Sequence, residues 1–307
     1  MSRPAVDATV LALDLGGTQV RAALVRPDGT RVGRSANSTP VSAGPAAIID
    51  ACIATLRAAR EVAAREDAAA EQRLVGIGVS APGPLNPWTG IAVEPANLGP
   101  SFPGTDIAGP ISAALGLPTY LEHDTKVAIL GERAFGAGRG IDDLLYLTIS
   151  TGLGGAVISG GHLITGPDDT AIEVGHAPIS LDGPPCSCGG SGHLESFVSG
   201  WALAAAGSAA ATSGESRAVA GMVNLFNPER IIIGGSYAEA RWGAISARIA
   251  QEIAGHAFKV PGSRVRIHPA ELGGDVSLAG CHPVVVGRLG NPDWERAVAA
   301  SRTGGRG

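Results

Sequence analysis

The chain has 307 residues, which suffices for about two domains with apolar cores of their own. Hydrophobic residues make up 45% of it and charged residues 17%, which excludes a disordered chain, and the net charge of −5 argues against a nucleic-acid partner. Its apolar runs are too short for a membrane span or a signal-peptide core, so we expect a cytoplasmic protein with no membrane partner.

The first part of the chain predicts an antiparallel meander of strands, then a helix and another strand. Alternating apolar residues between glycine turns indicate the strands, and an alanine-rich stretch with helical spacing indicates the helix. In chain order, these segments are the strands Val10–Asp14 and Gln19–Val25, a third run from Arg31, the helix Pro45–Ala70 and the strand Leu74–Val79.

The same pattern begins again near Leu144. A repeated strand-turn-strand unit predicts two similar domains facing a cleft, and clefts are where ligands usually bind. The later segments are the strand Leu144–Ile149, a glycine-rich turn, the strand Ala156–Ser159, a run at Leu163, a helix ending near Phe226, the strand Ile231–Ile233, a strand near Val265–Ile267 and a helix to about Leu289.

Both opening hairpins have hydroxyl residues beside their glycines, Thr18 in the first and Ser150 and Thr151 in the second. Backbone N–H groups and hydroxyls could there converge on phosphate oxygens without a side chain in the way. The alternative is that each turn only closes a hairpin. Two such turns at matching places favour a phosphate site.

The four cysteines are too few and too unevenly spaced for a disulfide framework. Cys186 and Cys188 lie close together in a glycine-rich stretch, which indicates metal ligands. Free thiols in a loop are the alternative interpretation.

Seven motifs occur in the order seen in ROK-family sugar kinases, and the sequence resembles that family from about residue 10 to Gly235. The resemblance implies an α/β actin-like ATPase fold of two ribonuclease H-like domains around a cleft, expected at residues 1–122 and 123–307, with a zinc-loop insertion at about 166–195. It also implies ATP-dependent phosphorylation of a hexose. The motifs are Asp14-Leu15-Gly16-Gly17-Thr18, Gly78-Val79-Ser80-Ala81-Pro82-Gly83-Pro84, Asn97-Leu98, His123-Asp124, Thr151-Gly152-Leu153-Gly154-Gly155, Glu173-Val174-Gly175-His176 and the run from Cys186 to Glu195.

The resemblance implies catalytic and ATP-binding roles. Asp124 would be the general base that accepts the proton of the sugar 6-hydroxyl, and its alternative role is that of a helix N-cap. Asp14 matches the carboxylate that orients Mg²⁺ through water. The residues implied to bind ATP and its phosphates are Asp14, Gly16, Gly17, Thr18, Thr151, Gly152, Gly154, Gly234 and Gly235.

The resemblance also implies a sugar site and a structural Zn²⁺. The Zn²⁺ would hold the loop that carries Glu173 and Glu195 beside the sugar. His193 stands where the family usually has a third cysteine, so a three-ligand or empty site is the alternative. The implied sugar-binding residues are Gly83, Asn97, His123, Asp124, Glu173, His176 and Glu195, and the implied zinc ligands are His176, Cys186, Cys188 and His193.

Several positions depart from the family pattern. His123 replaces the usual Asn and puts sugar specificity in doubt, and Ile172 replaces a Gly, which is expected to change that loop's backbone. Lys126, in place of Asn, is expected to point to solvent rather than towards the phosphoryl group. The stretch Trp201–Phe226 is shorter than in the family, which predicts weaker adenine binding.

The leading hypothesis is an ATP-dependent hexose kinase, with glucokinase first among the candidates. The alternative is a sugar-binding regulatory member of the family with weak or no kinase activity. The DNA-binding repressor branch is not expected, because its helix-turn-helix precedes the first strand and only about a dozen residues do so here. A homodimer is compatible with the resemblance.

Overall fold

The computed structural model describes residues 7–95, 97–199 and 212–302. The chain divides into two compact units. Unit 1 comprises Met1–Phe135, Pro167–Thr170 and Asp275–Gly307, and unit 2 comprises Gly136–Gly166 and Ala171–Gly274. Of the predicted shortened segment, Trp201–Phe226, residues 201–211 lie outside the described residues.

Unit 1 is built on a mixed sheet with the strand order β3-β2-β1-β4-β7. β1, β2 and β3 form the predicted antiparallel meander, and β4 and β7 run parallel to β1. Their apolar residues alternate between two buried faces, so helices cover both faces of the sheet. The strands are β1 (Thr9–Leu15), β2 (Gln19–Val25), β3 (Arg31–Ser38), β4 (Leu74–Ala81) and β7 (Thr119–His123), with a separate short pair β5 (Leu85–Asn86) and β6 (Ile91–Ala92).

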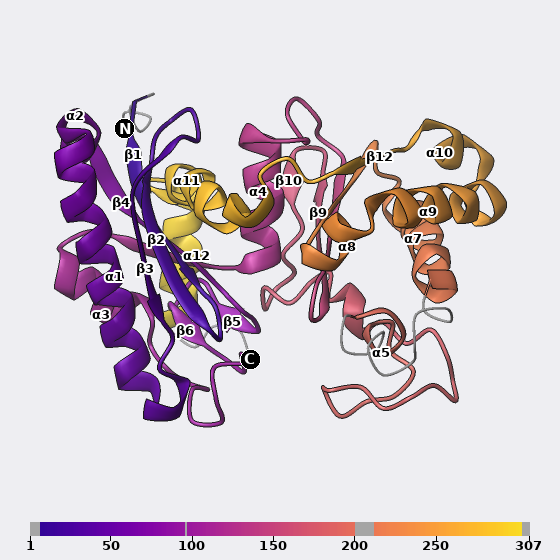
Figure 1. Ribbon diagram of the computed structural model, residues 1–307, viewed down its shortest axis with the longest axis horizontal. Coiled ribbons are helices and arrows are strands. Elements are labelled where there is room, and N and C mark those ends of the chain that lie inside the picture. Colours follow the sequence, from indigo (N-terminus) through magenta and orange to yellow (C-terminus); the bar gives the residue numbers. More distant parts are fainter. Residues whose placement is uncertain (1–6, 96, 200–211, 303–307) are drawn as a thin grey trace. The chain divides into compact units, whose positions relative to one another are not determined.

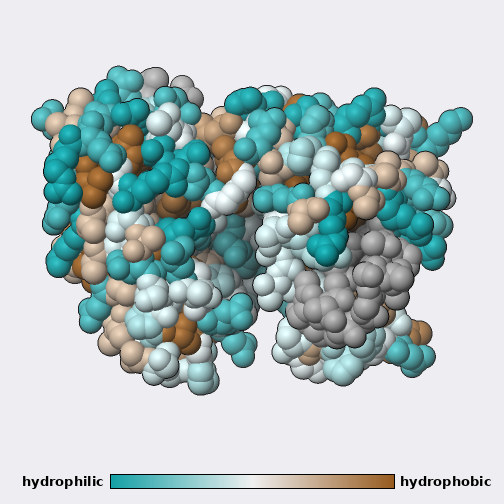
Figure 2. Space-filling view, viewed as in Figure 1, coloured by the Kyte–Doolittle hydropathy of each residue, from teal (hydrophilic) through white to brown (hydrophobic). Residues whose placement is uncertain are grey.

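Helices pack on the two faces of this sheet (Figure 1). α1 (Pro45–Glu66) buries Ile48, Cys52 and Leu56 against β2 and β3, and its outer surface carries hydrophilic side chains (Figure 2). α4 (Asp124–Phe135) and α11 (Val276–Arg288) cover the other face. The remaining helices of unit 1 are α2 (Ala68–Gln72), α3 (Ala108–Leu115) and α12 (Pro292–Arg302).

The predicted helix over residues 45–70 is split in two at Asp67. The Asp67 backbone leaves the helical region, with φ −154°, and its side chain accepts a hydrogen bond from the Ala70 N–H group. Asp67 therefore caps a second short helix instead of continuing the first.

Unit 2 repeats the strand pattern of unit 1, with the order β10-β9-β8-β11-β12. β8 and β9 form the predicted second hairpin, and β11 and β12 lie parallel to β8. The strands are β8 (Leu144–Ile149), β9 (Leu153–Ser159), β10 (His162–Leu163), β11 (Arg230–Gly234) and β12 (Arg266–Pro269), and the helices are α5 (Glu195–Val198), α7 (Thr212–Phe226), α8 (Ser236–Ala240), α9 (Trp242–His256) and α10 (Lys259–Arg264). The duplicated order confirms the predicted repeat.

The compact units are divided differently from the predicted domains. α4 lies beyond the expected boundary after residue 122 but belongs to unit 1, as do α11 and α12 near the end of the chain. The reason is burial: Leu278, Cys281 and Val284 of α11 pack in one cluster with Ala12, Ala23 and Val127 of unit 1. Among the described residues, no helix is both long enough and apolar enough to span a bilayer.

Candidate active site

The parallel strands of unit 1 bring several predicted site residues to one edge of the sheet. Asp14 lies at the carboxyl end of β1, Gly83 follows β4, and His123 ends β7. Because the carboxyl ends of parallel strands meet at the same edge, their loops lie next to one another. Asp124, the first residue of α4, follows directly, and its side chain is 47% exposed.

Asp14 is a largely buried carboxylate, 17% exposed, whose charge interacts with that of Asp124. Arg21, its partner in the β1–β2 ladder, donates to Asp14 Oδ2 from Nε at 3.0 Å and from Nη2 at 2.5 Å. Burial raises the pKa of Asp14; the Arg21 charge opposes this, and the nearby Asp124 carboxylate adds to it. Both Arg21 bonds end on Oδ2, so Arg21 does not use the other carboxylate oxygen.

The first glycine turn lies directly against the loop of Asn97. A Cβ atom on Gly17 would lie 2.7 Å from the Asn97 carbonyl oxygen, so glycine is required there. Asn97 itself is exposed, and with a φ of 70° it adopts the left-handed backbone conformation. The Gly16 N–H group donates to Gln19 O at 3.0 Å, which closes the hairpin. This N–H group is therefore not free for a phosphate, whereas Thr18 is exposed.

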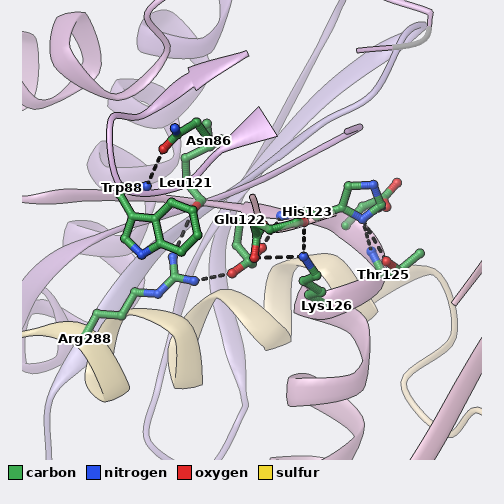
Figure 3. A network of polar contacts seen from close by, with 10 residues as sticks. Asn86, Trp88, Leu121, Glu122, His123, Thr125, Lys126 and Arg288 are labelled. Carbon is green, nitrogen blue, oxygen red and sulfur yellow. Dashed lines mark hydrogen bonds and ion pairs between the residues drawn. The ribbon is translucent and has the colours of Figure 1, made fainter. Parts of the chain in front are cut away.

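The Cδ2–Nε2 edge of the His123 ring lies directly against Gly83. A Cβ atom at Gly83 would lie 2.0 Å from His123 Cδ2 and 2.4 Å from Nε2. On its other side, His123 Nδ1 lies 2.7 Å from Thr125 Oγ1 and 3.2 Å from Asp124 Oδ1 (Figure 3). The glycine after β4 thus makes room for the imidazole beside the candidate base.

A buried network of charged residues lies just before Asp124 in the chain. Glu122, fully buried, forms an ion pair with Arg288 of α11, and its Oε1 accepts the His123 N–H group at 2.7 Å (Figure 3). Arg288 Nη1 also donates to Leu121 O at 2.9 Å. Burial alone would raise the pKa of Glu122, but the charges of Arg288 and Lys126 hold it below its ordinary value.

The prediction that Lys126 points to solvent is wrong. Its side chain is 3% exposed, and Nζ lies 2.8 Å from Oδ1 of Asp169, which is equally buried. Nζ also donates to the Asp169 carbonyl oxygen. Lys126 lies on the buried side of α4, and the two carboxylates near it, Glu122 and Asp169, compensate the cost of burying its charge.

The second glycine turn, in unit 2, lies against Glu195. Oε2 of Glu195 accepts the Leu153 N–H group at 3.1 Å and lies 2.8 Å from where a Cβ atom on Gly152 would be. Gly155 is equally confined, since its Cβ atom would lie 2.8 Å from Val174 Cγ2. Thr151 is exposed at the turn. A candidate phosphate turn and a candidate sugar ligand are therefore neighbours within unit 2.

Gly234 and Gly235 lie beside this turn, at the carboxyl end of β11. β11 pairs in parallel with β8, and Ser236 Oγ lies 3.1 Å from Ser150 Oγ. Gly235 has φ 96°, and a Cβ atom there would lie 2.4 Å from Ile149 O. Only glycine fits this close approach of two strand ends.

The predicted zinc residues come together in unit 2. The ligand atoms of His176, Cys186, Cys188 and His193 all lie within 4.8 Å of one another. Cys186 Sγ is 3.7 Å from His176 Nδ1, and Cys188 Sγ is 3.2 Å from His193 Nδ1. Zn–S and Zn–N bonds of about 2.3 and 2.1 Å in a tetrahedron place S and N about 3.6 Å apart. The four donors therefore fit Zn²⁺.

The loop before this cluster carries the last predicted sugar residues. Glu173 is exposed and precedes a short 3₁₀ turn, Val174–His176. Because His176 turns Nδ1 towards Cys186, its Nε2 is left for another partner. Ile172 has φ 72°, so it adopts the left-handed backbone that glycine favours.

Sequence reasoning did not single out Glu122, Asp169 and Arg288. A Glu preceding His123-Asp124 and a charged Lys126 inside an apolar helical stretch are signals of a buried network. Asp169 and Arg288 carry no such local signal, because their partners are distant in sequence.

Comparison with known proteins agrees with this architecture. The ROK family model matches residues 10–219. The chain belongs to the ROK family.

It is 31% identical over 272 residues to a glucokinase of Thermotoga maritima, covering 75% of this chain and 83% of the relative. It is 33% identical over 213 residues to an N-acetylmannosamine kinase of Shigella flexneri, covering 69% and 68% of the two chains. The crystal structure of a ROK hexokinase from Thermus thermophilus superposes with a TM-score of 0.73 at 28% identity, over 91% of this chain and 97% of the other. These matches confirm the predicted family and its actin-like α/β fold.

Proposed function

We propose that this ROK-family chain is an ATP-dependent hexose kinase that transfers the γ-phosphoryl group of ATP to the sugar 6-hydroxyl, with glucose as the first candidate. The observation that carries the proposal is the meeting of Asp14, the turn Gly16–Thr18 and Asp124 at one edge of the unit 1 sheet. The matches to a glucokinase and an N-acetylmannosamine kinase support a sugar as the acceptor.

Asp124 is suited to act as general base. A sugar hydroxyl is a weak nucleophile, and a carboxylate within hydrogen-bond reach accepts its proton as the phosphoryl group arrives. Asp124 is half exposed, so a substrate can reach it, and His123 and Gly83 lie beside it. We assign the sugar to these residues together with Asn97.

The two glycine turns and the Gly234-Gly235 corner are the groups assigned to ATP. Thr18 and Thr151 present exposed hydroxyls suited to phosphate oxygens, whereas the Gly16 N–H group is already used within its hairpin. Mg²⁺, when bound with ATP, neutralises charge on the phosphates. Asp14 is assigned to orient it through a bound water, as the family resemblance implies, from the carboxylate oxygen that Arg21 does not contact.

Unit 2 is assigned the rest of the sugar contacts. Glu173, His176 and Glu195 offer charged and polar groups that suit a ring of hydroxyls. A Zn²⁺ on His176, Cys186, Cys188 and His193 would stabilise a loop of exposed residues with little core of its own.

A coupled assay with ATP, Mg²⁺ and a panel of glucose, mannose and N-acetylmannosamine tests the proposal. Asp124→Asn removes the proton acceptor but keeps the shape, so kcat should fall by about 10²- to 10⁴-fold while the sugar KM changes little. Asp50→Asn, an exposed aspartate on α1, is the matched control and should behave like the wild type.

If no sugar is phosphorylated, or if Asp124→Asn is as active as the wild type, the proposal is wrong. Hexose binding in calorimetry with no response to ATP would instead identify a sugar-binding regulatory protein.

A further inference from the structure

The segment Pro167–Thr170 belongs to unit 1, although the chain before and after it belongs to unit 2. Of its four residues, all described, only Asp169 is buried. Asp169 is held by Lys126, through its Oδ1 at 2.8 Å and through its carbonyl oxygen. The contacts of Asp169 with Lys126, together with a side-chain hydrogen bond to Glu122, therefore tie this segment to unit 1.

Lys126, the partner of Asp169 in this ion pair, lies next to the candidate base Asp124 in the sequence. Lys126 is two residues after Asp124, in the first turn of α4. Figure 3 shows Lys126 and Arg288 on opposite sides of Glu122, whose carboxylate accepts the His123 N–H group. The network thus holds the backbone on both sides of the candidate base.

The other end of the anchored segment leads to candidate sugar ligands. Glu173 is four residues after Asp169, a distance of at most about 14 Å for extended chain. The span is further restricted because both Asp169 and Ile172 have left-handed backbone, with φ 59° and 72°. Anchoring Asp169 therefore limits where Glu173 and His176 can go.

The pair is poorly explained as a device for stability. Removing two charges from water costs free energy that their attraction often fails to recover, and an apolar pair is frequently as stable. Here the Glu122 carboxylate adds a like charge beside Asp169. A role in holding the segment Pro167–Thr170 in place accounts for the arrangement better.

We propose that Lys126 and Asp169 are positioning residues for phosphoryl transfer, tying the segment that leads to Glu173 and His176 to the helix turn that carries Asp124. Without the tie, the segment that starts at Pro167 would no longer be fixed to α4, and the candidate sugar ligands that follow it would be held less accurately. The inference rests on the proposed kinase function.

The decisive variant is the double substitution Lys126→Met with Asp169→Asn. It leaves no unpaired buried charge, so it should fold, and Asn tolerates the left-handed backbone. The matched control is Arg60→Met, which breaks the 2.8 Å pair of Arg60 with Glu71 between α1 and α2 of the same unit. Each protein is measured for kcat, for KM of hexose and of ATP, for Tm, and for hydrogen exchange of the amides of residues 168–176.

The expected result is a fall of about 10- to 100-fold in kcat/KM for hexose, with the ATP KM within about twofold of wild type. Exchange at residues 168–176 should become faster in the double variant while Tm stays near that of the wild type. Arg60→Met should change neither the hexose kinetics nor this exchange.

Wild-type hexose kinetics with wild-type exchange in the double variant would overturn the proposal. Equal losses for hexose and ATP together with a lower Tm would also overturn it, because they would indicate a structural role alone. If the wild-type chain phosphorylates no sugar, the proposed function fails separately. The exchange measurement then still decides whether the pair anchors the loop.

Discussion

The Nδ1 atom of His123 lies 3.2 Å from Oδ1 of Asp124, the candidate general base. The same Nδ1 lies 2.7 Å from the Thr125 hydroxyl and accepts the Thr125 N–H group at 3.4 Å. Nδ1 is therefore engaged by Asp124 and Thr125, as donor or acceptor according to the tautomer, and the remaining ring nitrogen is Nε2. That Nε2 lies on the side of Gly83, where we assign the sugar.

His123→Ala should therefore raise the hexose KM. Loss of one hydrogen bond worth about 1 kcal/mol corresponds to roughly a fivefold weaker interaction. The ATP KM should not change. Steady-state kinetics on glucose, mannose and N-acetylmannosamine measure the effect, and His162→Ala, an exposed histidine of β10, is the control. An unchanged hexose KM for all three sugars would remove His123 from the sugar site.

Zinc content provides a second prediction. The purified chain should contain about one Zn²⁺ per molecule, as expected for one four-ligand site, and Cys188→Ser should lose most of it because a hydroxyl is a poor zinc ligand. Ser191→Ala, an exposed position in the same loop, is the control. Elemental analysis gives the stoichiometry, and the hexose KM shows whether the loop of Glu195 has been disturbed. A chain purified without zinc that does not take it up would contradict the assignment.

Much of the fold could be predicted from local pattern. Alternating apolar and polar residues on either side of a glycine turn predict the hairpins β1–β2 and β8–β9. Because this pattern occurs twice, it also predicts two similar sheets. The break at Asp67 was missed because an alanine-rich stretch continues through it and only the side-chain cap interrupts it.

Residues of the candidate site could be predicted only where they lie within a short sequence motif. Asp124, Gly83 and the cysteine pair lie in short motifs, whereas the pairing of Lys126 with Asp169 spans 43 positions in the sequence. A lysine side chain is almost never fully buried unless it is paired, so sequence alone favours solvent for Lys126. Its burial here depends on tertiary packing of α4 and on a segment that returns to unit 1, and neither leaves a local signal.

The pH dependence of stability tests the buried network. Burial, reinforced by the Glu122 charge and opposed by Lys126, raises the pKa of Asp169 to about 7. A carboxyl with a raised pKa binds its proton more tightly in the folded chain, so its contribution to stability is complete below about pH 4 and is lost as pH rises to about 7.

In Asp169→Asn this contribution is absent, so the free energy of unfolding should fall less between about pH 4 and 7 than in the wild type. Asp14, whose pKa is also raised, contributes in the same direction to both proteins and cancels in the comparison. Urea unfolding across this range measures the slopes, with Asp168→Asn, an exposed neighbour, as control. Parallel curves for wild type and Asp169→Asn would contradict the raised pKa.

Gly235→Ala should separate the nucleotide side of the site from the sugar side. The backbone there has φ 96°, and a Cβ atom would lie 2.4 Å from the Ile149 carbonyl oxygen, so the corner beside Ser150 must shift. Because this corner is assigned to ATP, the ATP KM should rise by about tenfold or more while the hexose KM stays near wild type, and stability should fall by about 1–3 kcal/mol. Gly243→Ala in α9, where a Cβ atom meets nothing within 4 Å, should leave both KM values unchanged. A rise confined to the hexose KM would show that the Gly234-Gly235 corner serves the sugar rather than the nucleotide.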